Sequence, residues 1–483
     1  MESIIQHIVA KYKKILEEGL EASITGKEIS KLSKSVHEFT DKIGTEIFEQ
    51  LVEAVDKIIF EDQKRKVEYE AIRISGRTLL VENGKSKFER RYYQDKQSGE
   101  YIYLADKILG IEKGERIDKN VTAKAIELAG SVSYAKAGKN AVASEEVSRT
   151  SVMNRIRKNE LKVEPKELED KREVEYLYIQ ADEDHYKERN KGSSISKIIT
   201  IFEGSKIVSK NIVPGSQVRK ELTEKFTITG VYDQSEDMWL EAANYIESKY
   251  NLEKIKKVYI SGDGASWIKE GLNWIIKSQF VLDKIHLEKY ILKLNFNEEK
   301  QRHLRNAIEQ FDPISVENIL TSVEGGLRWE IQVKVAKGQD IKIETRRLKK
   351  ATEAKTYIIN QWEGIEIYET DKDTIIGCCQ EAQVSHVLSE RLSTRPMAWS
   401  KDGADKMSKV RAFLENDGDV YGKIIDISTK EKRDKRIAQL ENRVRRNMRR
   451  TMFGTVGTKI PELQASRDEL YCEIKELLNI KVS

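Results

Sequence analysis

Two short apolar segments that each lead into an aspartate constrain the fold of this chain most strongly. Residues 174–181 read VEYLYIQA and precede Asp182, and residues 256–262 read KKVYISG and precede Asp263. Aromatic and β-branched side chains favour pleated, largely buried strands, so we expect a strand at each segment. A carboxylate at the end of such a strand is held in place by the backbone before it.

Carboxylates held in this way are suited to a hard divalent cation. Mg²⁺ takes oxygen ligands and is usually bound through one or two carboxylates together with phosphate groups of the substrate. Two such ions about 4 Å apart can activate a water or a 3′-hydroxyl and stabilise the leaving oxygen of an in-line displacement. Gly262 and Gly264 flank Asp263, so little side-chain bulk crowds a ligand there. The alternative is that both acids only cap turns.

The order of the expected elements around the two aspartates indicates the fold class. The strand of Asp182 is followed by strand-like stretches at 195–203 and 205–213, a helical pattern at 236–250 and the strand of Asp263. A helix, SWIKEGLNWII, and a short strand, QFVLD, come next. Three strands, a helix, a strand, a helix and a strand form the succession of a ribonuclease-H-like core, a mixed α/β sheet covered by helices. Fold order alone does not give function.

Four strings along the chain resemble those of one family. They are ADED at 181–184, GDGASW at 262–267, DKIHLEKYI at 283–291 and CCQEAQVSHVLSERLSTRPMAWS at 378–400. In these strings the chain resembles bacterial insertion-sequence transposases of the DDE type. It is most similar to the ISLre-type group, formerly described as an uncharacterised protein family and akin to Mutator-like transposases. The similarity extends from the N-terminal region to about residue 415, and it implies that the catalytic, metal-holding acids fall on Asp182, Asp263 and Glu381.

The resemblance also implies residues that support the three acids. Asp283 and His286 match the Asp-x-x-His variant of a Cys-x-x-His signature that related transposases carry after the second acid. Asp184 lies two residues after Asp182 and hence on the same face of a strand. Together with Glu183, it is the alternative first acid.

Glu381 and Trp267 each have an ordinary structural alternative. Apolar residues at helical spacing predict a helix over 381–393, where the helix dipole favours a glutamate in the first turn and Glu390 is a competing third acid. Trp267 could stack on an unpaired base at a transposon end. An aromatic side chain on a helix that faces a sheet belongs more often to the core.

The spacing of the second and third acids requires an inserted domain. Glu381 follows Asp263 by 118 residues (381 minus 263), far more than a simple connection needs. The helix-forming patterns of residues 296–376 predict a helical insertion, which related transposases also carry at this point. The ribonuclease-H-like core would then comprise residues 166–295 and 377–425. A basic cluster in the insertion could track phosphates or could form a solvated helix face: Lys342, Arg346, Arg347, Lys349 and Lys350.

The first third of the chain is expected to hold a DNA-binding region. Residues 1–70 carry apolar residues at helical spacing and predict a helical region that packs within the chain or forms a dimer contact. Residues 71–165 predict a β-ribbon around Asn83-Gly84 and then a helix-turn-helix, with a plain three-helix bundle as the alternative. We expect its helices in VTAKAIELAGSVSYAKAG, in AVASEEV and, capped by Ser148, in RTSVMNRIRKN. The last helix would reach DNA with Arg149, Asn154, Arg155, Arg157 and Lys158.

A second basic segment lies in the expected C-terminal region, 426–483. Residues 430–450 hold ten Lys or Arg against three acids, a balance of +7 (10 minus 3). Such a segment gains from releasing counterions from a nucleic acid, which favours DNA contact through residues such as Arg445 and Arg446. The alternative is a basic amphipathic helix packed on protein. Arg391, in the same string as Glu381, is a further candidate for DNA contact.

The overall composition agrees with an intracellular DNA enzyme without requiring one. The 483 residues carry 85 Lys and Arg against 81 Asp and Glu, so the net charge of +4 is small. Cys378, Cys379 and Cys472 show no Cys-x-x-Cys spacing, which argues against a disulfide framework and a zinc ribbon. No apolar stretch approaches the ~20 residues that span a bilayer, and no P-loop string is present. We therefore expect a cytoplasmic protein without a membrane partner or ATP hydrolysis.

The combined expectation is a multidomain α+β DNA transposase. It would use Mg²⁺, with Mn²⁺ as a substitute, would bind double-stranded DNA at the transposon ends and the target, and would act as a homo-oligomer. Two other functions remain open: a domesticated DNA-binding protein that no longer transposes, and a host metal-dependent nuclease of the same fold. Terminal inverted repeats around the gene would favour the transposase over both.

Overall fold

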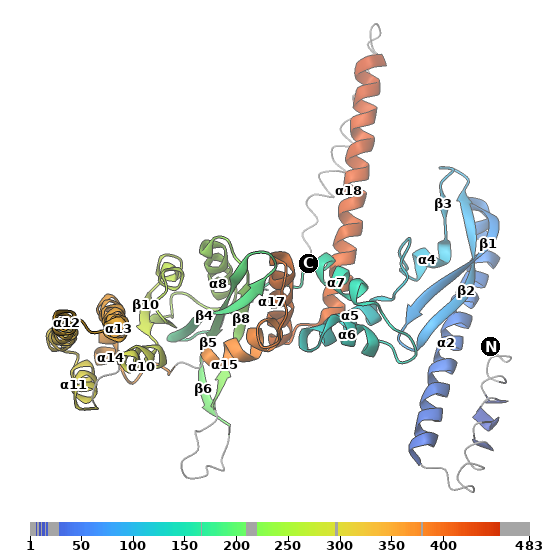
Figure 1. Cartoon of the computed structure of the whole chain (residues 1–483). Helices are drawn as coiled ribbons and strands as arrows, with labels where there is room; N and C mark the ends of the chain where they lie inside the picture. Colours follow the sequence, from blue (N-terminus) through green and yellow to red (C-terminus); the bar gives the residue numbers. More distant parts are fainter. Residues whose placement is uncertain are drawn as a thin grey trace. The chain divides into compact units, whose positions relative to one another are not determined.

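The chain is a mixed α+β protein that divides into two compact units, residues 1–421 and 422–483 (Figure 1). The computed structural model describes residues 29–165, 167–208, 220–294, 298–377 and 380–454, together with a few positions between 6 and 17. The expectations for most of the first 28 residues, for the three cysteines and for the segment after residue 454 lie outside the described residues.

A five-stranded sheet with the order β10-β9-β4-β5-β8 forms the centre of the first unit. Its strands are β4 (Tyr176–Glu188), β5 (Gly192–Phe202), β8 (Phe226–Gly230), β9 (Lys257–Gly262) and β10 (Ser278–Leu282). β10, β9 and β4 are parallel, whereas β5 is antiparallel to both of its neighbours. The strands predicted before Asp182 and Asp263 are therefore present and lie next to each other. The prediction that the first strand ends at Asp182 is wrong, because pairing with β5 extends β4 through Asp182 to Glu188.

The third strand of this sheet differs from the expected one. The prediction of a core strand over 205–213 is wrong, because β6 (Gly204–Ile207) pairs with β7 (Lys220–Thr223) in a separate two-stranded sheet. Residues 209–213 lie outside the described part. The third place in the core is taken by β8, whose five residues, FTITG, are all buried. Both faces of β8 are covered, so its threonines are as buried as its apolar residues.

Helices cover both faces of the central sheet. On one face Leu177 and Ile260 join the main hydrophobic core together with Trp239 of α8 (Ser235–Lys249), which is fully buried. On the other face Tyr178 stacks on Phe202 and on Tyr259, with ring centroids 5.5 and 5.7 Å apart. On that face α17 (Lys401–Glu415) contacts β8 and α14 (Trp362–Asp371) packs beside the aromatic cluster. The helix expected in SWIKEGLNWII is short: α9 (Ser266–Lys269) and a 3-10 turn, η1 (Glu270–Asn273).

The described residues between β10 and Asp371 are mainly helical, in agreement with the helix-forming patterns of 296–376. Its helices are α10 (Lys284–Lys293), α11 (Glu298–Glu309), α12 (Pro313–Ala336), α13 (Lys342–Asn360) and α14. Asp312 caps α12 by accepting the Ser315 N–H at 3.0 Å, and Pro313 occupies the first turn, where a helix does not need its missing N–H. Leu304 and Leu320 belong to the same hydrophobic core as the sheet, so the insertion packs directly against it.

A three-stranded sheet forms the N-terminal part of the first unit. The elements here are α2 (Ile29–Glu61), α3 (Gln63–Glu68), β1 (Tyr69–Val81), β2 (Gly84–Asp95), β3 (Tyr101–Ile102) and α4 (Leu104–Ile108). The predicted ribbon is present: β1 and β2 pair antiparallel across a tight turn that ends at Gly84, whose φ is +141°. Val52 of α2 packs on Leu79 and Phe88 of the sheet.

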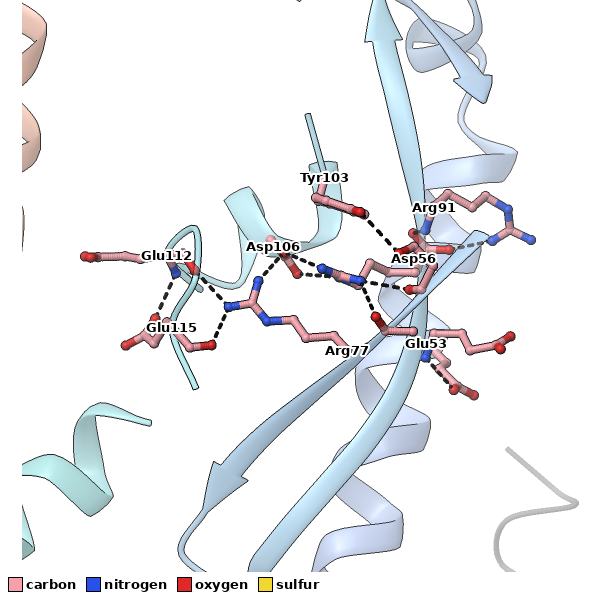
Figure 2. Close-up of polar contacts among 12 residues, drawn as sticks. Glu53, Asp56, Arg77, Arg91, Tyr103, Asp106, Glu112 and Glu115 are labelled. Atoms are coloured by element: carbon pink, nitrogen blue, oxygen red, sulfur yellow. Dashed lines mark hydrogen bonds and ion pairs between the residues drawn. The ribbon is translucent and has the colours of Figure 1, made fainter. Parts of the chain in front are cut away.

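Arginine–aspartate pairs fasten this sheet to its helices (Figure 2). Asp106 of α4 accepts hydrogen bonds from Arg77 at 2.6 Å and from Arg90 at 3.1 Å, and all three side chains are at most 10% exposed. Arg91 donates to Asp56 of α2 at 2.5 Å. These arginines of the ribbon therefore stabilise the fold and are not displayed for a partner.

Three helices follow the N-terminal sheet: α5 (Lys119–Ser131), α6 (Tyr134–Asn140) and α7 (Arg149–Lys158). The prediction of one helix through VTAKAIELAGSVSYAKAG is wrong. α5 ends at Ser131, and Ser133 starts a new helix by accepting the Lys136 N–H. Ser148 caps α7 as predicted, accepting the Ser151 N–H at 3.2 Å.

The segment AVASEEV is not the predicted helix either. It folds back onto α6, where Val147 donates its N–H to the Gly138 carbonyl oxygen at 3.0 Å. A Cβ at Gly138 would lie 1.9 Å from the Val147 carbonyl oxygen. Only a glycine allows this approach, which carries the chain directly to the start of α7.

The described part of the second unit belongs to one helix, α18 (Val420–Gly454). The basic segment 430–450 lies within it, and the side chain of Arg445 is exposed. None of the described helices combines the length and the apolarity needed to cross a membrane.

Candidate functional site

Three aspartates lie in one row across adjacent parallel strands: Asp182 within β4, and Asp263 and Asp283 directly after the last residues of β9 and β10. Gln180 of β4 is paired with Ser261 of β9, and Gly262 of β9 is paired with Leu282 of β10. Continued in the same register, the row contains Asp182, Asp263 and Asp283. The sheet thus brings together acids that are far apart in the sequence.

Asp182 is partly buried, and burial dominates its chemistry. Burial raises the pKa of Asp182 to about 6; a hydrogen bond from the Glu183 N–H, 2.8 Å long, and the neighbouring His286 oppose this rise, whereas the charge of Asp263 adds to it. A carboxylate in such a place is stabilised by any cation that approaches it.

Asp263 lies in a tight turn that needs glycine on both sides. Its Oδ1 accepts the Ala265 N–H at 2.9 Å, and Gly264 has a φ of +86°, which side chains with a Cβ rarely adopt. A Cβ at Gly262 would lie 2.7 Å from the Ala181 carbonyl oxygen. Glycine at this position therefore lets β9 lie close to β4 and keeps the two acids near each other.

The insertion supports the same turn. The hydroxyl of Tyr357 in α13 donates to the carbonyl oxygen of Asp263 at 2.6 Å, and Nε2 of Gln361 donates to the carbonyl oxygen of Gly264 at 3.2 Å. The Tyr357 ring stacks on Tyr290 of α10, with centroids 3.7 Å apart. No motif in the sequence marked Tyr357 or Gln361, because their role depends on contacts across about 94 residues of chain.

Asp283 and His286, the supporting pair implied by the resemblance, lie at the start of α10, where Asp283 neighbours Asp263 in the row and His286 interacts with the charge of Asp182. Asp283 is 3% exposed and begins α10 by accepting the Ile285 N–H at 3.1 Å. Its other oxygen lies 2.7 Å from His286 Nδ1. This hydrogen bond and the charges of Asp283 and Asp182 raise the pKa of His286. The pair therefore favours a positively charged imidazole next to Asp182.

Glu381 lies at the edge of this cluster and is paired with Lys289. It belongs to α15 (Gln380–Gln383), its side chain is 48% exposed, and it forms an ion pair with Lys289 of α10. The Lys289 ammonium also interacts with the charges of Asp283 and Asp182, so one cation links the aspartate row to the third acid. Lys289 follows His286 by three residues in the string DKIHLEKYI, a helical spacing that could have identified it from the sequence.

The alternative acids have other partners. Asp184 accepts hydrogen bonds from Ser389 at 3.0 Å and Ser393 at 3.1 Å through one oxygen. Glu183 accepts a hydrogen bond from Trp267 Nε1 at 3.0 Å. Because Trp267 is only 8% exposed, its ring belongs to the core and does not present a face to a base. Of the first-acid candidates that the pKa shifts describe, Asp182 interacts with the charge of Asp263, whereas Asp184 does not.

Glu390, the competing third acid, has charged partners of its own. Glu390 contacts the Arg411 guanidinium at 3.2 Å and lies 3.9 Å from His386, its neighbour one turn earlier. These contacts give Glu390 a structural role, whereas Glu381 is linked to the aspartate row through Lys289.

The pair Asp182 and Asp263 fits a divalent cation that is completed by substrate oxygens. Within the described ranges, no lysine or arginine forms an ion pair with either carboxylate, and no three His, Cys, Asp or Glu lie close enough together to hold one ion. Mg²⁺ needs only one or two protein carboxylates when phosphate oxygens fill its remaining positions. Glu381 would have to leave Lys289 to become a further ligand.

Some of the candidate DNA-contacting residues are displayed on the surface. Arg149 of α7, Arg346 of α13 and Arg445 of α18 are exposed, and so is Lys158 at the end of α7. The side chain of Arg446 lies outside the described part of the chain. Exposed cations of this kind can contact phosphates.

The other candidates are engaged within the protein. Arg157 donates to Ser400 Oγ at 3.0 Å, and Arg347 lies 3.6 Å from Glu330. Arg155 is partly buried, and burial lowers its pKa.

Arg391 does not fit a role in DNA contact. It is 6% exposed, it donates to the Ala129 carbonyl oxygen at 2.9 Å, and its guanidinium lies 4.9 Å from the ring centre of Trp399. Its burial excludes a direct phosphate contact in this structure.

Fold and site together define a mixed α+β protein whose central sheet presents two half-buried aspartates beside basic groups. The model of an uncharacterised protein family, UPF0236, matches residues 23–424. A UPF0236 protein of Caldanaerobacter subterraneus subsp. tengcongensis is 41% identical over 397 residues, which are 82% of this chain and 80% of the relative. Two other UPF0236 proteins of that organism are as similar, and their names join eleven and four locus designations. The chain belongs to the UPF0236 family.

Proposed function

We propose that this chain is a DNA transposase that cuts the ends of an insertion sequence and joins them to target DNA with the help of divalent metal ions. The observation that carries the proposal is the placement of Asp182 and Asp263 in one row on the neighbouring parallel strands β4 and β9, where their charges interact. Burial without an ion-paired lysine or arginine leaves the two carboxylates to be neutralised by a ligand.

The succession of elements supports a ribonuclease-H-like core. β4, β5 and β8 are followed by α8, β9, the short helix α9 with η1, and β10. Apart from the β6–β7 hairpin, this is the order expected for that class, and the helical insertion follows at the expected point. We likewise assign α5, α6 and α7 to a helix-turn-helix that binds double-stranded DNA, with exposed Arg149 at the start of its last helix.

Each residue of the site has a part in this chemistry. Asp182 and Asp263 would hold the metal, and a bound pair of Mg²⁺ ions would activate a water or a 3′-hydroxyl and stabilise the leaving oxygen. His286, oriented by Asp283, and Lys289 place positive charge beside the acids, where a phosphodiester would bind. Glu381 would join the two aspartates when Lys289 turns to that phosphate.

The relatives add an independent argument. The names of two of them join eleven and four loci of a single genome. A protein encoded at many places in one genome is expected when its gene lies on an element that inserts copies of itself. A host nuclease or a domesticated DNA-binding protein does not lead to this expectation.

The test compares Asp263→Asn with Asp373→Asn, an exposed aspartate outside the site. The substrates are labelled duplexes from the DNA on either side of the gene. With Mg²⁺, the wild type and Asp373→Asn should nick and join these ends, whereas Asp263→Asn should be slower by at least about 10³-fold because a metal ligand is lost. Binding of the duplex should change by less than about twofold, since α7 is untouched.

The outcomes separate the alternatives. Mg²⁺-dependent cleavage that survives in Asp263→Asn would refute the assignment of the site. Cleavage of branched DNA without joining would favour a host nuclease. DNA binding that is the same with and without Mg²⁺, with no cleavage by the wild type, would favour a domesticated DNA-binding protein.

A further inference from the structure

The helix that carries Glu381 contains a turn of unusual geometry. Between α15 and α16 (Glu390–Leu392), residues Val384–Ser389 form a π-helical turn, η2. Isolated π-turns within α-helices are rare and often occur at functional sites. The wider turn replaces the usual α-helical hydrogen bonds by longer-range ones, such as that from the Glu390 N–H to the Ser385 carbonyl oxygen, and a side chain can hold its carbonyl oxygens from outside.

Arg411 of α17 donates to two of these carbonyl oxygens. Its side chain is nearly buried, with the residue 9% exposed. Nε donates to the Val387 carbonyl oxygen at 3.0 Å, and Nη2 donates to the His386 carbonyl oxygen and contacts Glu390 at 3.2 Å. The planar guanidinium, with its fixed fork of donors, thus stabilises the π-turn, which a lysine could not do with a single ammonium.

The same guanidinium also reaches the three-helix unit. Its Nη1 donates to the Gly130 carbonyl oxygen, 3.3 Å away, in the last turn of α5. Arg391, on the Glu381 helix, donates to the preceding carbonyl oxygen, that of Ala129. α5 has no basic residue in its own last turn, so these two arginines provide the positive charge that favours a helix C-terminus.

The opposite side of the π-turn is attached to the strand of the first acid. Ser389 and Ser393 both donate to Asp184, which lies two residues after Asp182 on the same face of β4. The π-turn is therefore held from two directions, by Asp184 of the central sheet and by Arg411, which also holds α5.

We propose that Arg411 is a positioning residue that couples the three-helix unit α5–α7 to Glu381. This inference rests on the proposed function, in which α7 contacts DNA and Glu381 is the third acid. A displacement of α5 when α7 binds DNA is transmitted through Arg411 to the carbonyl groups of His386 and Val387, and through them to the turn that carries Glu381. The acid is thereby brought into position when the correct DNA is bound.

The first test is kinetic and uses the full chain. Arg411→Lys keeps the charge but loses the fork, so duplex binding should change by less than about twofold while kcat for Mg²⁺-dependent cleavage falls by about 30-fold, as expected for the loss of two to three hydrogen bonds. The matched control is Arg395→Lys, an exposed arginine near the same helix, which should cleave like the wild type. A kcat for Arg411→Lys within threefold of the wild type would overturn the inference, as would a loss of DNA binding in proportion to the loss of cleavage.

The second test does not depend on cleavage. Hydrogen exchange is measured with and without a duplex from the DNA that flanks the gene. In the wild type, the duplex should slow exchange in residues 149–158 and in residues 384–391, and in Arg411→Lys it should slow exchange only in residues 149–158. Wild-type protection confined to 149–158 would refute the coupling even if cleavage is observed. Coupled protection in a wild type that does not cleave would refute the proposed function alone, and absence of DNA binding would refute both.

Discussion

The acidic side chains of the two main sheets differ in their charged partners. In the N-terminal sheet, Asp106 lies between two arginines and Asp56 is paired with a third (Figure 2). In the central sheet, Asp182 and Asp263 lie side by side, and burial raises the pKa of Asp182 to about 6. A buried carboxylate paired with arginine stabilises a fold, whereas Asp182, which interacts with the charge of the His286 imidazole, is stabilised further by a bound cation. The contrast separates structural acids from candidate functional acids.

Removing a structural acid should produce the largest change in stability. Asp106→Asn leaves Arg77 and Arg90 buried without their counter-charge, so the free energy of unfolding of the N-terminal sheet should fall by about 3–5 kcal/mol. Hydrogen exchange of the β1 and β2 amides measures this change. Glu100→Gln, at an exposed position, is the control and should have little effect. A decrease in the free energy of unfolding of less than about 1 kcal/mol would show that Asp106 is not a structural acid and would contradict the proposed contrast between the sheets.

Removing a functional acid should have the opposite sign. The folded pKa of Asp182, about 6, is above its ordinary value of 3.8. Folding is therefore penalised by this group only when its carboxyl group must ionise: there is no penalty below pH ~4, and stability is lost as the pH rises through about 6. Asp182→Asn avoids this loss, so at pH 8 and without metal it should be more stable than the wild type by about 1–3 kcal/mol. Denaturant unfolding between pH 4 and pH 8 measures the difference, which should vanish at the acidic end. A variant that is less stable at pH 8 would contradict the prediction.

A divalent metal ion should stabilise the protein through the acids of the central sheet and not through those of the N-terminal sheet. At 10 times its dissociation constant, Mn²⁺ or Mg²⁺ should stabilise the wild type by about 1.4 kcal/mol, because it binds the folded form. The stabilisation by metal should be mostly lost in Asp263→Asn. It should be retained in Asp106→Asn, because that substitution leaves the central sheet unchanged. Thermal unfolding with and without the metal measures these differences. An equal response of all three proteins would place the metal elsewhere.

The smallest effect is expected at Lys289. Its ion pair with Glu381 is about half exposed, so Lys289→Met should change stability by less than about 1 kcal/mol. It should nevertheless strengthen Mn²⁺ binding several-fold, because Glu381 is released toward the aspartates. The gain should be absent when Glu381 is replaced by Gln, and calorimetry on the four proteins of this cycle measures it. An equal gain in both backgrounds would show only the loss of a nearby positive charge.

Local patterns predicted the strands before Asp182 and Asp263, the Ser148 cap and the ribbon at Gly84, because each depends on a few neighbouring residues. Local patterns failed where distant segments decide the structure. β8 was missed because its buried threonines disguise a core strand, and the fold of AVASEEV depends on the close approach to Gly138.

The candidate site shows the same division. The two aspartates and the Asp283–His286 pair are marked by local strings, and the sheet register brings them together. The partner of Glu381 and the burial of Arg391 depend on helices that meet only in the folded chain. From its charge alone, Arg391 was wrongly predicted to contact DNA at the surface. Its guanidinium is buried and donates to a carbonyl oxygen in the last turn of α5.

The bonds from Tyr357 and Gln361 to the turn after β9 have a consequence for how members of this family can diverge. A hybrid protein that receives the helical insertion of a distant relative would carry residues at positions 357 and 361 that did not evolve with its own Asp263 turn. The turn and these two residues are therefore expected to be inherited together, even though some 90 residues of sequence separate them.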